Sequence, residues 1–306
     1  MNCKSSDQPL SVTNPTSFEQ VLEGFLLDRK AQGVSKKTYG LYYKELNYFK
    51  DFIEKKGIFS IDEITPNAIR QYLDELSSHR NSGGCHMAYR TIKSLTYWWE
   101  QELDGDYISP MRKVKAPRLE KKLLEPVDLG DVRKMIDACD GRFSYRDKAI
   151  LHALLDTGCR ANEFISIDRE DLDIERGLIF VRYGKGGKQR MVIIGKQSRK
   201  AIRNYLRHRK DTCPALWVTD DQHRLTYWGL RQIVRRAAER AGLEEPSLHS
   251  FRRAFVVAML RKRVNNMTIR NLMGHADLRV LERYANQSAV ELEDAYRDGS
   301  PGDLEY

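Results

Sequence analysis

A basic stretch interrupted by prolines divides this chain into two halves. Between Gly105 and Val127 the apolar periodicity typical of helices stops, and Pro110, Pro117 and Pro126 punctuate the sequence. Proline removes a backbone donor and does not continue a helix, so this stretch predicts a linker over residues 105–127. A chain of 306 residues is also too long for most single cores, and we therefore expect two domains.

The first half predicts a helical domain over residues 16–104, preceded by a flexible polar tail at residues 1–15. Ser17, Ser35 and Thr65 each stand where an N-cap is needed, directly before an apolar helical pattern. The second of these helices carries aromatic and apolar residues at helical spacing, a pattern that favours a core face over a base-stacking platform. These residues are Tyr39, Tyr42, Tyr43, Leu46, Phe49 and Ile53.

The second half predicts a mainly helical domain over residues 128–298, followed by a tail at residues 299–306. Its clear β signal is a pair of short apolar runs, at 178–183 and 190–194, joined by a glycine-rich turn. The fold class we expect is therefore mainly α with a small β-hairpin or sheet, that is, α+β.

The glycine-rich turn, Gly184–Gln189, has the sequence GKGGKQ. It matches neither common phosphate-binding loop, and it lies between two strands instead of opening a helix. We interpret it as a hairpin tip that presents Lys185 and Lys188. Taken alone, a solvated turn with lysines for solubility fits the segment equally well.

Positive charge is concentrated in the second part of the chain. The net charge is +9; residues 1–105 hold 13 Lys+Arg against 14 Asp+Glu, so the excess lies in residues 106–306. Such asymmetry favours a polyanionic partner, most often nucleic acid. Part of the charge lies in the predicted linker, as a solvated hinge or as a segment along a phosphate backbone: Arg112, Lys113, Lys115 and Arg118.

Several classes of protein are disfavoured by composition. No run of about 18 apolar residues exists that would predict a transmembrane helix. The five cysteines are scattered and form no CxxC pair, which argues against a disulfide framework or a zinc ribbon. The polar N-terminus does not resemble a signal peptide. We therefore expect a soluble protein of a reducing compartment, with no membrane partner.

Four short motifs follow one another in the second half: RxxE at Arg160–Glu163, GKGxK at 184–188, HxxR at His249–Arg252, and LMGH ending at His275. Tyr284 follows nine residues later. A lone histidine or tyrosine in such places is usually a packing or capping residue. Residues three apart on a helix lie on one face, so Arg160 and Glu163 are placed to pair. Together, in this order, the motifs resemble the tyrosine recombinase (phage integrase) family.

The resemblance implies an N-terminal helical core-binding domain and a C-terminal catalytic domain that form a C-shaped clamp around duplex DNA. It implies a phosphate-activating set with a tyrosine nucleophile, Tyr284, and with Glu163 in support; the set is Arg160, Lys185, His249, Arg252 and His275. Lys188 and the linker cations are the expected DNA contacts. Arg253 stands where the family usually has a histidine.

The chemistry of these residue types agrees with the implied roles. Phosphoryl transfer builds charge on the non-bridging oxygens, which calls for paired guanidiniums such as Arg160 and Arg252. The departing 5′ oxygen needs a proton, and Lys185 is a candidate general acid. His249 and His275 can donate hydrogen bonds to the phosphate or transfer protons. No Asp/Glu cluster with magnesium-like spacing lies near them, so we expect neither a metal nor another cofactor such as ATP.

The function we expect is site-specific DNA recombination or integration through a covalent 3′-phosphotyrosyl intermediate. The resemblance implies double-stranded recombination sites as substrate, a homotetramer on DNA, the cytoplasm and nucleoid of a prokaryote, and accessory DNA-bending proteins as possible partners. Two alternatives stay open. One is a type IB topoisomerase, against which the separate N-terminal domain and the short chain argue. The other is a catalytically silent DNA-binding protein, against which the presence of all six groups argues.

Overall fold

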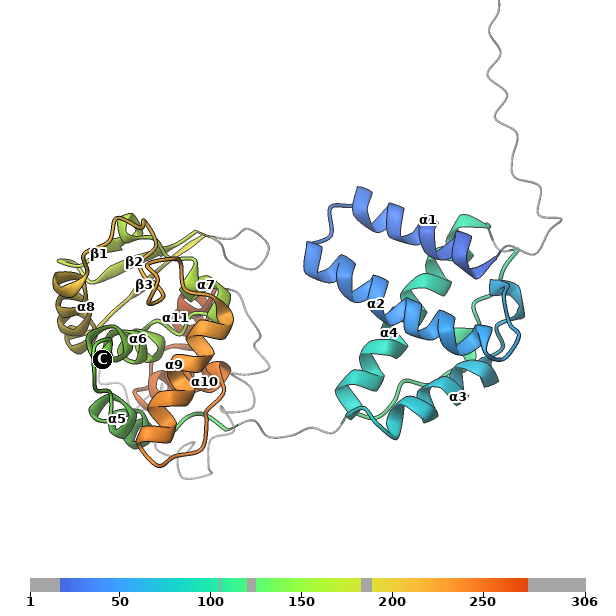
Figure 1. The fold of residues 1–306 in the computed structure, drawn as a ribbon. Coiled ribbons are helices and arrows are strands. Elements are labelled where there is room, and N and C mark those ends of the chain that lie inside the picture. The colour runs from blue at the N-terminus through green and yellow to red at the C-terminus, as the bar shows by residue number, and fades with distance from the viewer. Residues whose placement is uncertain (1–16, 105, 120–124, 183–188, 275–306) are drawn as a thin grey trace, which may run out of the picture. The chain divides into compact units, whose positions relative to one another are not determined.

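The chain folds into two units, which the computed structural model describes over residues 17–104, 106–119, 125–182 and 189–274 (Figure 1). The first unit comprises Met1–Lys122 and the second Leu123–Tyr306. Each has its own hydrophobic core. The predicted fold class, mainly helical with a small sheet, is confirmed.

Four α-helices and two short 3-10 helices make up the described part of the first unit. Ser17, Ser35 and Thr65 cap the first three α-helices as predicted, each side chain accepting a backbone N–H in the first turn. The elements are α1 (Phe18–Ala31), α2 (Lys36–Glu54), η1 (Ile61–Glu63), α3 (Pro66–Ser77), α4 (Ser82–Glu102) and η2 (Pro110–Lys113).

Aromatic side chains fill the centre of this unit. Phe25 meets Tyr42 and Trp98 edge to face, with ring centroids 5.2 and 5.6 Å apart. Phe49 is fully buried, as the spacing on α2 predicts. Tyr43 is 55% exposed, so the predicted core stripe on α2 was wrong at this position. Tyr43 directly follows Tyr42, so it is rotated about 100° around the helix from the face that Tyr42, Leu46 and Phe49 present to the core.

The beginning of the predicted linker packs onto this first unit. Tyr107, Met111 and Val114 are buried in its core. Ser109 donates a 2.7 Å hydrogen bond to Thr96 on α4, and the carbonyl of Val114 accepts one from a tyrosine of the same helix. Apolar burial therefore extends the first unit by about ten residues beyond the predicted boundary at 104.

The described part of the second unit contains seven α-helices, a 3-10 helix and three strands. They are α5 (Leu129–Asp137), α6 (Ser144–Thr157), α7 (Ala161–Ile165), η3 (Arg169–Asp171), β1 (Leu172–Asp173), β2 (Leu178–Val181), β3 (Arg190–Ile193), α8 (Lys196–His208), α9 (Tyr227–Arg240), α10 (Leu248–Arg261) and α11 (Asn266–Met273).

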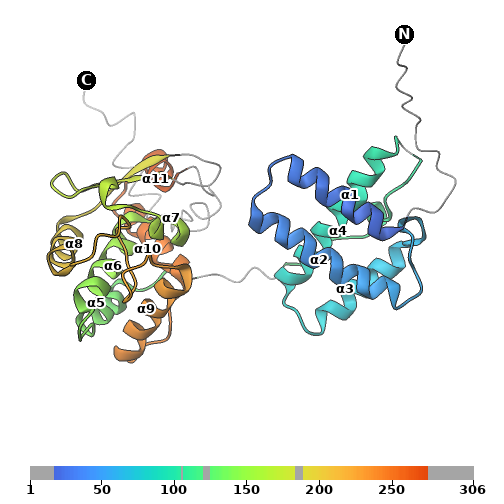
Figure 2. The ribbon, with the colours of Figure 1, turned by 45° about the horizontal axis from the view of Figure 1, so that its top comes forward.

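Helix α6 is the central element of this unit, and α5, α8, α9, α10 and β3 all pack against it (Figure 2). Ile150 and Leu151 on α6 are fully buried. On the other side of the core, Trp217 stacks between Phe164 and Tyr205, at centroid distances of 4.9 and 5.9 Å. A helix that is apolar on most of its circumference is expected at the middle of a domain.

The sheet is antiparallel, with strand order β1-β2-β3. The hairpin predicted from the two apolar runs is present, and its register pairs Leu178 with Ile193 and Val181 with Arg190. Strand β1 was not predicted, because two residues carry no periodicity. Helix α9 was not predicted either, because its many arginines obscure its apolar face.

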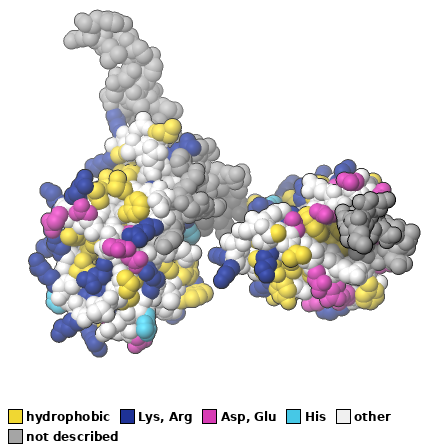
Figure 3. All heavy atoms as spheres, turned by 90° about the horizontal axis from the view of Figure 1, so that it is seen from above, with side chains coloured by type: hydrophobic (Ala, Val, Ile, Leu, Met, Phe, Trp, Pro, Cys, Tyr) yellow, Lys and Arg dark blue, Asp and Glu magenta, His cyan; other side chains and the backbone are white. Residues whose placement is uncertain are grey.

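Basic side chains are prominent on the surface of the second unit. In Figure 3, dark blue Lys and Arg atoms outnumber acidic ones on its visible face. Several of these arginines are in ion pairs at the surface, such as Arg203 with Glu175 at 2.8 Å. No helix within the described ranges has the length and apolar character needed to cross a bilayer.

The packing of residues 106–114 predicts that a fragment covering 17–118 is more stable than one covering 17–104. The shorter fragment lacks Tyr107, Met111 and Val114, and burying each such side chain contributes about 1.5–3 kcal/mol. We expect urea denaturation of the two fragments to differ by at least about 3 kcal/mol in unfolding free energy. Equal stability would instead support the boundary at 104.

Candidate active site

A left-handed glycine positions the first arginine of the site. Helix α6 ends at Gly158, whose φ is +55°, and Arg160 then serves as the N-cap of α7. A Cβ atom at Gly158 would lie 2.7 Å from the ring of Phe255 on α10. Glycine is therefore required here both by the backbone angle and by the close approach of α10.

Glu163 is a buried carboxylate, 4% exposed, that accepts three hydrogen bonds. Its Oε1 accepts from Arg160 Nη1 at 2.6 Å. Its Oε2 accepts from the backbone N–H of Arg160 at 3.0 Å and from Arg190 Nη2 at 2.8 Å. Burial alone would raise the pKa of Glu163, but the hydrogen bonds from Arg190 and Arg160 outweigh it and hold the pKa below its usual value.

Arg252, on α10, is 8% exposed and is held by two backbone carbonyls. Its Nη1 donates to Gly158 O at 2.6 Å, and its Nη2 donates to Met273 O at 3.0 Å. Burial, together with the positive charge of Arg160, lowers the pKa of Arg252 to about 10. The group stays cationic at neutral pH, in surroundings that an anion would make more favourable.

His249 lies at the first turn of α10, three residues before Arg252 on the same helix. Its side chain remains exposed. Desolvation by the surrounding atoms, followed by the charges of Arg252, Arg253 and Arg160, lowers the pKa of His249 from its ordinary value. This shift favours the neutral imidazole, in which one nitrogen can donate a hydrogen bond and the other can accept one.

Arg190, the first residue of β3, belongs to this cluster, although the sequence motifs did not identify it. Besides Glu163, its guanidinium donates from Nε to Leu272 O at 2.9 Å. A signal was available: Arg190 alternates with Val192 and Ile194, which are 1% and 3% exposed, so its position faces the core. An arginine on the apolar face of a strand needs buried acceptors.

Gly274 ends α11 in the left-handed conformation, with φ of +70°. A Cβ at this glycine would lie 3.0 Å from Cδ of Arg190. The glycine of the LMGH motif therefore leaves room for Arg190 directly before His275.

The remaining predicted site residues are not brought into this cluster by the described structure. Tyr284, His275, Lys185 and Lys188 lie outside the described residues. The four linker cations belong to the first unit. Among them Arg112 contacts Glu100 at 3.1 Å, and Lys113, Lys115 and Arg118 have exposed side chains.

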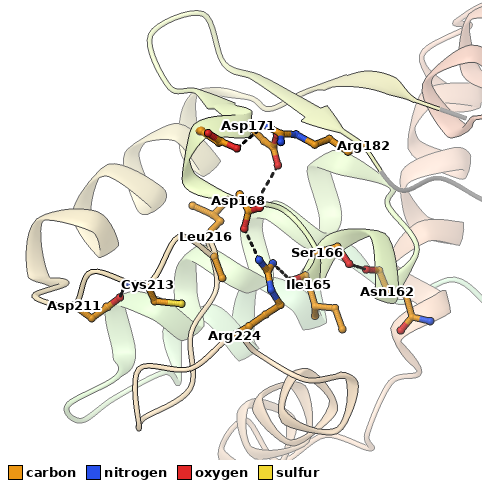
Figure 4. Close-up of polar contacts among 12 residues, drawn as sticks. Asn162, Ile165, Ser166, Asp168, Asp171, Arg182, Asp211, Cys213, Leu216 and Arg224 are labelled. Atoms are coloured by element: carbon orange, nitrogen blue, oxygen red, sulfur yellow. Dashed lines mark hydrogen bonds and ion pairs between the residues drawn. The ribbon is translucent and has the colours of Figure 1, made fainter. Parts of the chain in front are cut away.

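A second polar network holds the other strand of the hairpin, at the same end as Arg190 (Figure 4). Arg182, which follows β2, donates to Asp171 at 2.5 Å. Asp171 also accepts the backbone N–H of Asp168 at 2.9 Å, and Asp168 is paired with Arg224. Arg224 in turn donates to the carbonyl of Ile165, at the end of α7. Both strands of the hairpin are thus tied by arginines, next to the turn, to the segment around α7.

The cluster can bind and polarise an anion. Two guanidiniums, of Arg160 and Arg190, pair with the Glu163 carboxylate, and a third, of Arg252, interacts electrostatically with Arg160 and with His249, which leaves an excess of positive charge in the cluster. Each guanidinium has five N–H donors, so Arg160 and Arg252 retain donors beyond those that they use within the protein. Within the described ranges, no group of three His, Cys, Asp or Glu side chains is arranged to hold a metal ion.

Comparison with known proteins decides the family. The model of the phage integrase family matches residues 127–291. The tyrosine recombinase XerA of Pyrococcus horikoshii is 30% identical over 285 residues, which cover 90% of this chain and 92% of that protein. This chain belongs to the phage integrase family of tyrosine recombinases.

Other relatives and solved structures agree. The tyrosine recombinase XerC of Staphylococcus aureus is 28% identical over 93% of this chain and 97% of its own length. The fold is shared with the Tn1549 transposon integrase in complex with a circular intermediate DNA, at a TM-score of 0.74 and 14% identity over 91% of this chain and 98% of that one. A lambda integrase tetramer bound to a Holliday junction gives a TM-score of 0.73 at 13% identity over 92% of this chain and 82% of that one.

The recombinase is therefore an enzyme that breaks and rejoins DNA at specific sites. At the position where the family usually has a histidine, its Arg253 donates to the carbonyl of Glu125 at 3.0 Å and to Ser247 Oγ at 3.3 Å. Arg253 thus fastens the segment that enters the second unit to the start of α10.

The geometry of Gly158 gives a prediction with a matched control. Gly158→Ala places a methyl group against Phe255, whereas Gly141→Ala, at φ of +76° in the same unit, meets nothing within 4 Å. Both variants carry the strain of a left-handed alanine, about 1–2 kcal/mol. Only Gly158→Ala adds overpacking, about 1–3 kcal/mol more. Urea denaturation of both variants checks this difference; an equal loss would show that Phe255 moves aside freely.

Proposed function

We propose that the recombinase cleaves one DNA strand at a time with Tyr284 as nucleophile. The phenolic oxygen attacks the phosphorus, the bond from phosphorus to the 5′ oxygen breaks, and a 3′-phosphotyrosyl ester forms. A 5′-hydroxyl from a second strand then attacks this ester and releases the tyrosine. The ester conserves the energy of the broken bond, so the cycle balances without a nucleotide cofactor.

The observation that carries this proposal is the placement of Arg160 and Arg252 around one turn. Arg160 follows Gly158 by two residues, and Arg252 donates to the carbonyl of Gly158. Because Arg160 extends from this turn and is held by Glu163, while Arg252 is bonded to the turn itself, the two guanidiniums can serve as a preoriented pair of donors for the non-bridging oxygens. Preorganised donors of this kind stabilise the charge that develops in the transition state.

Three further side chains handle protons or bind the phosphate in this proposal. Lys185 protonates the departing 5′ oxygen, and His249 and His275 donate hydrogen bonds to the phosphate or transfer protons. The low pKa of His249 follows from burial and from the neighbouring arginines. A bound phosphate would offset those positive charges and raise that pKa toward neutrality, the range in which a histidine exchanges protons efficiently.

We further propose that Arg112, Lys113, Lys115 and Arg118 contact DNA phosphates, together with Lys188 of the hairpin turn. The exposure of Lys113, Lys115 and Arg118 supports this role. Arg112 has Glu100 as a partner, so its contribution to DNA affinity should be the smallest of the four.

Strand exchange between two duplexes requires four cleavages, and each chain has one Tyr284. We therefore propose a homotetramer on DNA, in which the segment 288–297 docks on a neighbouring subunit; that segment lies outside the described residues. A lambda integrase with the same fold is a tetramer on a Holliday junction, which supports this assembly. Since the substrate is DNA and the relatives are prokaryotic, we place its action at the nucleoid, in the cytoplasm.

The first prediction for this chemistry concerns the nucleophile. Tyr284→Phe deletes only a hydroxyl, so covalent adduct formation on a nicked suicide substrate should fall to background. DNA affinity should change little, because phosphate contacts spread over the protein supply it. A denaturing gel and a binding titration measure the two quantities. Adduct formation at the wild-type level would move the nucleophile elsewhere, with Tyr296 as the nearest alternative.

The second prediction separates the two lysines of the hairpin. Lys185→Ala should slow cleavage by about 100-fold or more on ordinary DNA, within the range that general acid catalysis contributes. On a 5′-bridging phosphorothiolate it should recover most of the rate, because a leaving thiolate needs no proton. Lys188→Ala, the matched control, should show no such selective recovery. The reverse pattern would assign the general acid to Lys188.

The same suicide substrate tests the alternatives. A catalytically silent DNA-binding protein forms no adduct, whereas a type IB topoisomerase forms one but relaxes supercoiled DNA without exchanging strands between two sites. Recombinant product from two target sites, formed by the wild-type protein and absent with Tyr284→Phe, supports the proposed recombinase chemistry.

A further inference from the structure

Arg190 is a buried arginine that lies beside the proposed catalytic set without belonging to it. It begins β3 opposite Val181, and its side chain is 8% exposed. A guanidinium in such a place loses much of its hydration, which is unfavourable unless acceptors replace the lost water. The identity of those acceptors indicates what the arginine does.

The acceptors of Arg190 come from two different motif segments. Glu163 Oε2 lies 2.8 Å from Nη2, and Leu272 O lies 2.9 Å from Nε. The Nη2 group also approaches Cys159 Sγ at 3.7 Å. The guanidinium of Arg190 therefore connects three segments: strand β3, the turn that carries Arg160, and the end of α11.

Two arginines share the carboxylate of Glu163, and in the proposed mechanism only Arg160 also has to bind the phosphate. Arg160 must keep its charge and its free donors for the phosphate, yet it donates to Glu163 Oε1 at 2.6 Å. Arg190 occupies the other oxygen and supplies a second positive charge. With Arg190 present, the negative charge of Glu163 is balanced by the positive charge of Arg190. The positive charge of Arg160 then remains available to a bound anion.

Loss of Arg190 would change this balance. Glu163 would stay buried with a single arginine as partner, and a carboxylate and one guanidinium favour a pair with two parallel hydrogen bonds. Such a pair would turn Arg160 toward Glu163 and consume both its charge and its donors. The interaction that is weakened would be the one between Arg160 and the charged non-bridging oxygens of the substrate.

We propose that Arg190 is a positioning residue that acts through Glu163 to keep the guanidinium of Arg160 free and aimed at the DNA phosphate. The inference rests on the proposed role of Arg160. It does not require Arg190 to touch DNA.

The test compares two substrates that differ in charge at the scissile position. A methylphosphonate replaces one non-bridging oxygen by a methyl group, so the linkage is neutral and depends less on Arg160. Arg190→Met should reduce the rate of adduct formation on phosphate DNA about 100-fold, as for loss of one oriented donor. On either methylphosphonate diastereomer the loss should be at least about tenfold smaller, with the apparent KM for DNA nearly unchanged.

Three comparisons make the result decisive. Arg190→Lys keeps one charged donor and should fold and retain intermediate activity, even where the methionine variant is unstable. Arg182→Met loosens the other strand of the hairpin, beside the same turn, without touching Glu163, and any loss it causes should be equal on both substrates (Figure 4). The double variant with Glu163→Gln should lose little more than the more damaging single change, because both act through one carboxylate.

Two outcomes would overturn the inference. One is an equal loss on phosphate and methylphosphonate for both Arg190 variants, which indicates a merely structural role. The other is a full multiplication of the losses in the double variant. Failure of the wild-type protein to form any adduct on phosphate DNA would instead refute the proposed function, so the two failures are distinguishable.

Discussion

Burying the Glu163 carboxylate is unfavourable unless several donors reach it, and this requirement organises the surroundings of the site. The carboxylate is satisfied by the N-terminus of α7, by the side chain of Arg160 and by an arginine from the sheet. Each of these partners comes from an element that must be correctly packed first. The carboxylate thus links the position of β3 to the orientation of the Arg160 guanidinium, the group that we propose binds the DNA phosphate.

Two arginines tie the same pair of segments together from different sides. Arg252, on α10, bonds to Gly158 O and Met273 O; Arg190, on β3, bonds to Glu163 and Leu272 O. The turn after α6 and the end of α11 are therefore held by four hydrogen bonds, all charge-assisted and largely removed from water. Three of the four acceptors are backbone oxygens, and the fourth is the carboxylate of Glu163.

Much of this architecture was predictable because its determinants are local. The caps at Ser17, Ser35 and Thr65, and the pairing of Arg160 with Glu163, depend on residues within three or four positions. The contacts of Arg190 span 27 and 82 residues in the chain, and no local pattern encodes those partners. The packing of Met111 into the first unit escaped prediction because its basic neighbours resemble a solvated linker.

Contacts on both sides limit the length of the segment that joins the units. The carbonyl oxygen of Pro117 lies 3.4 Å from Nδ1 of His86 in the first unit, and the carbonyl of Glu125 accepts from Arg253 in the second. The chain between them, residues 118–124, spans at most about 30 Å when fully extended. If both units contact DNA, as we propose, they behave as a bivalent ligand joined by this segment: once one is bound, the other is confined at an effective concentration near the millimolar range. Weak individual contacts then suffice for tight binding of the whole chain, and either unit can release and rebind while its partner keeps the protein on the same duplex.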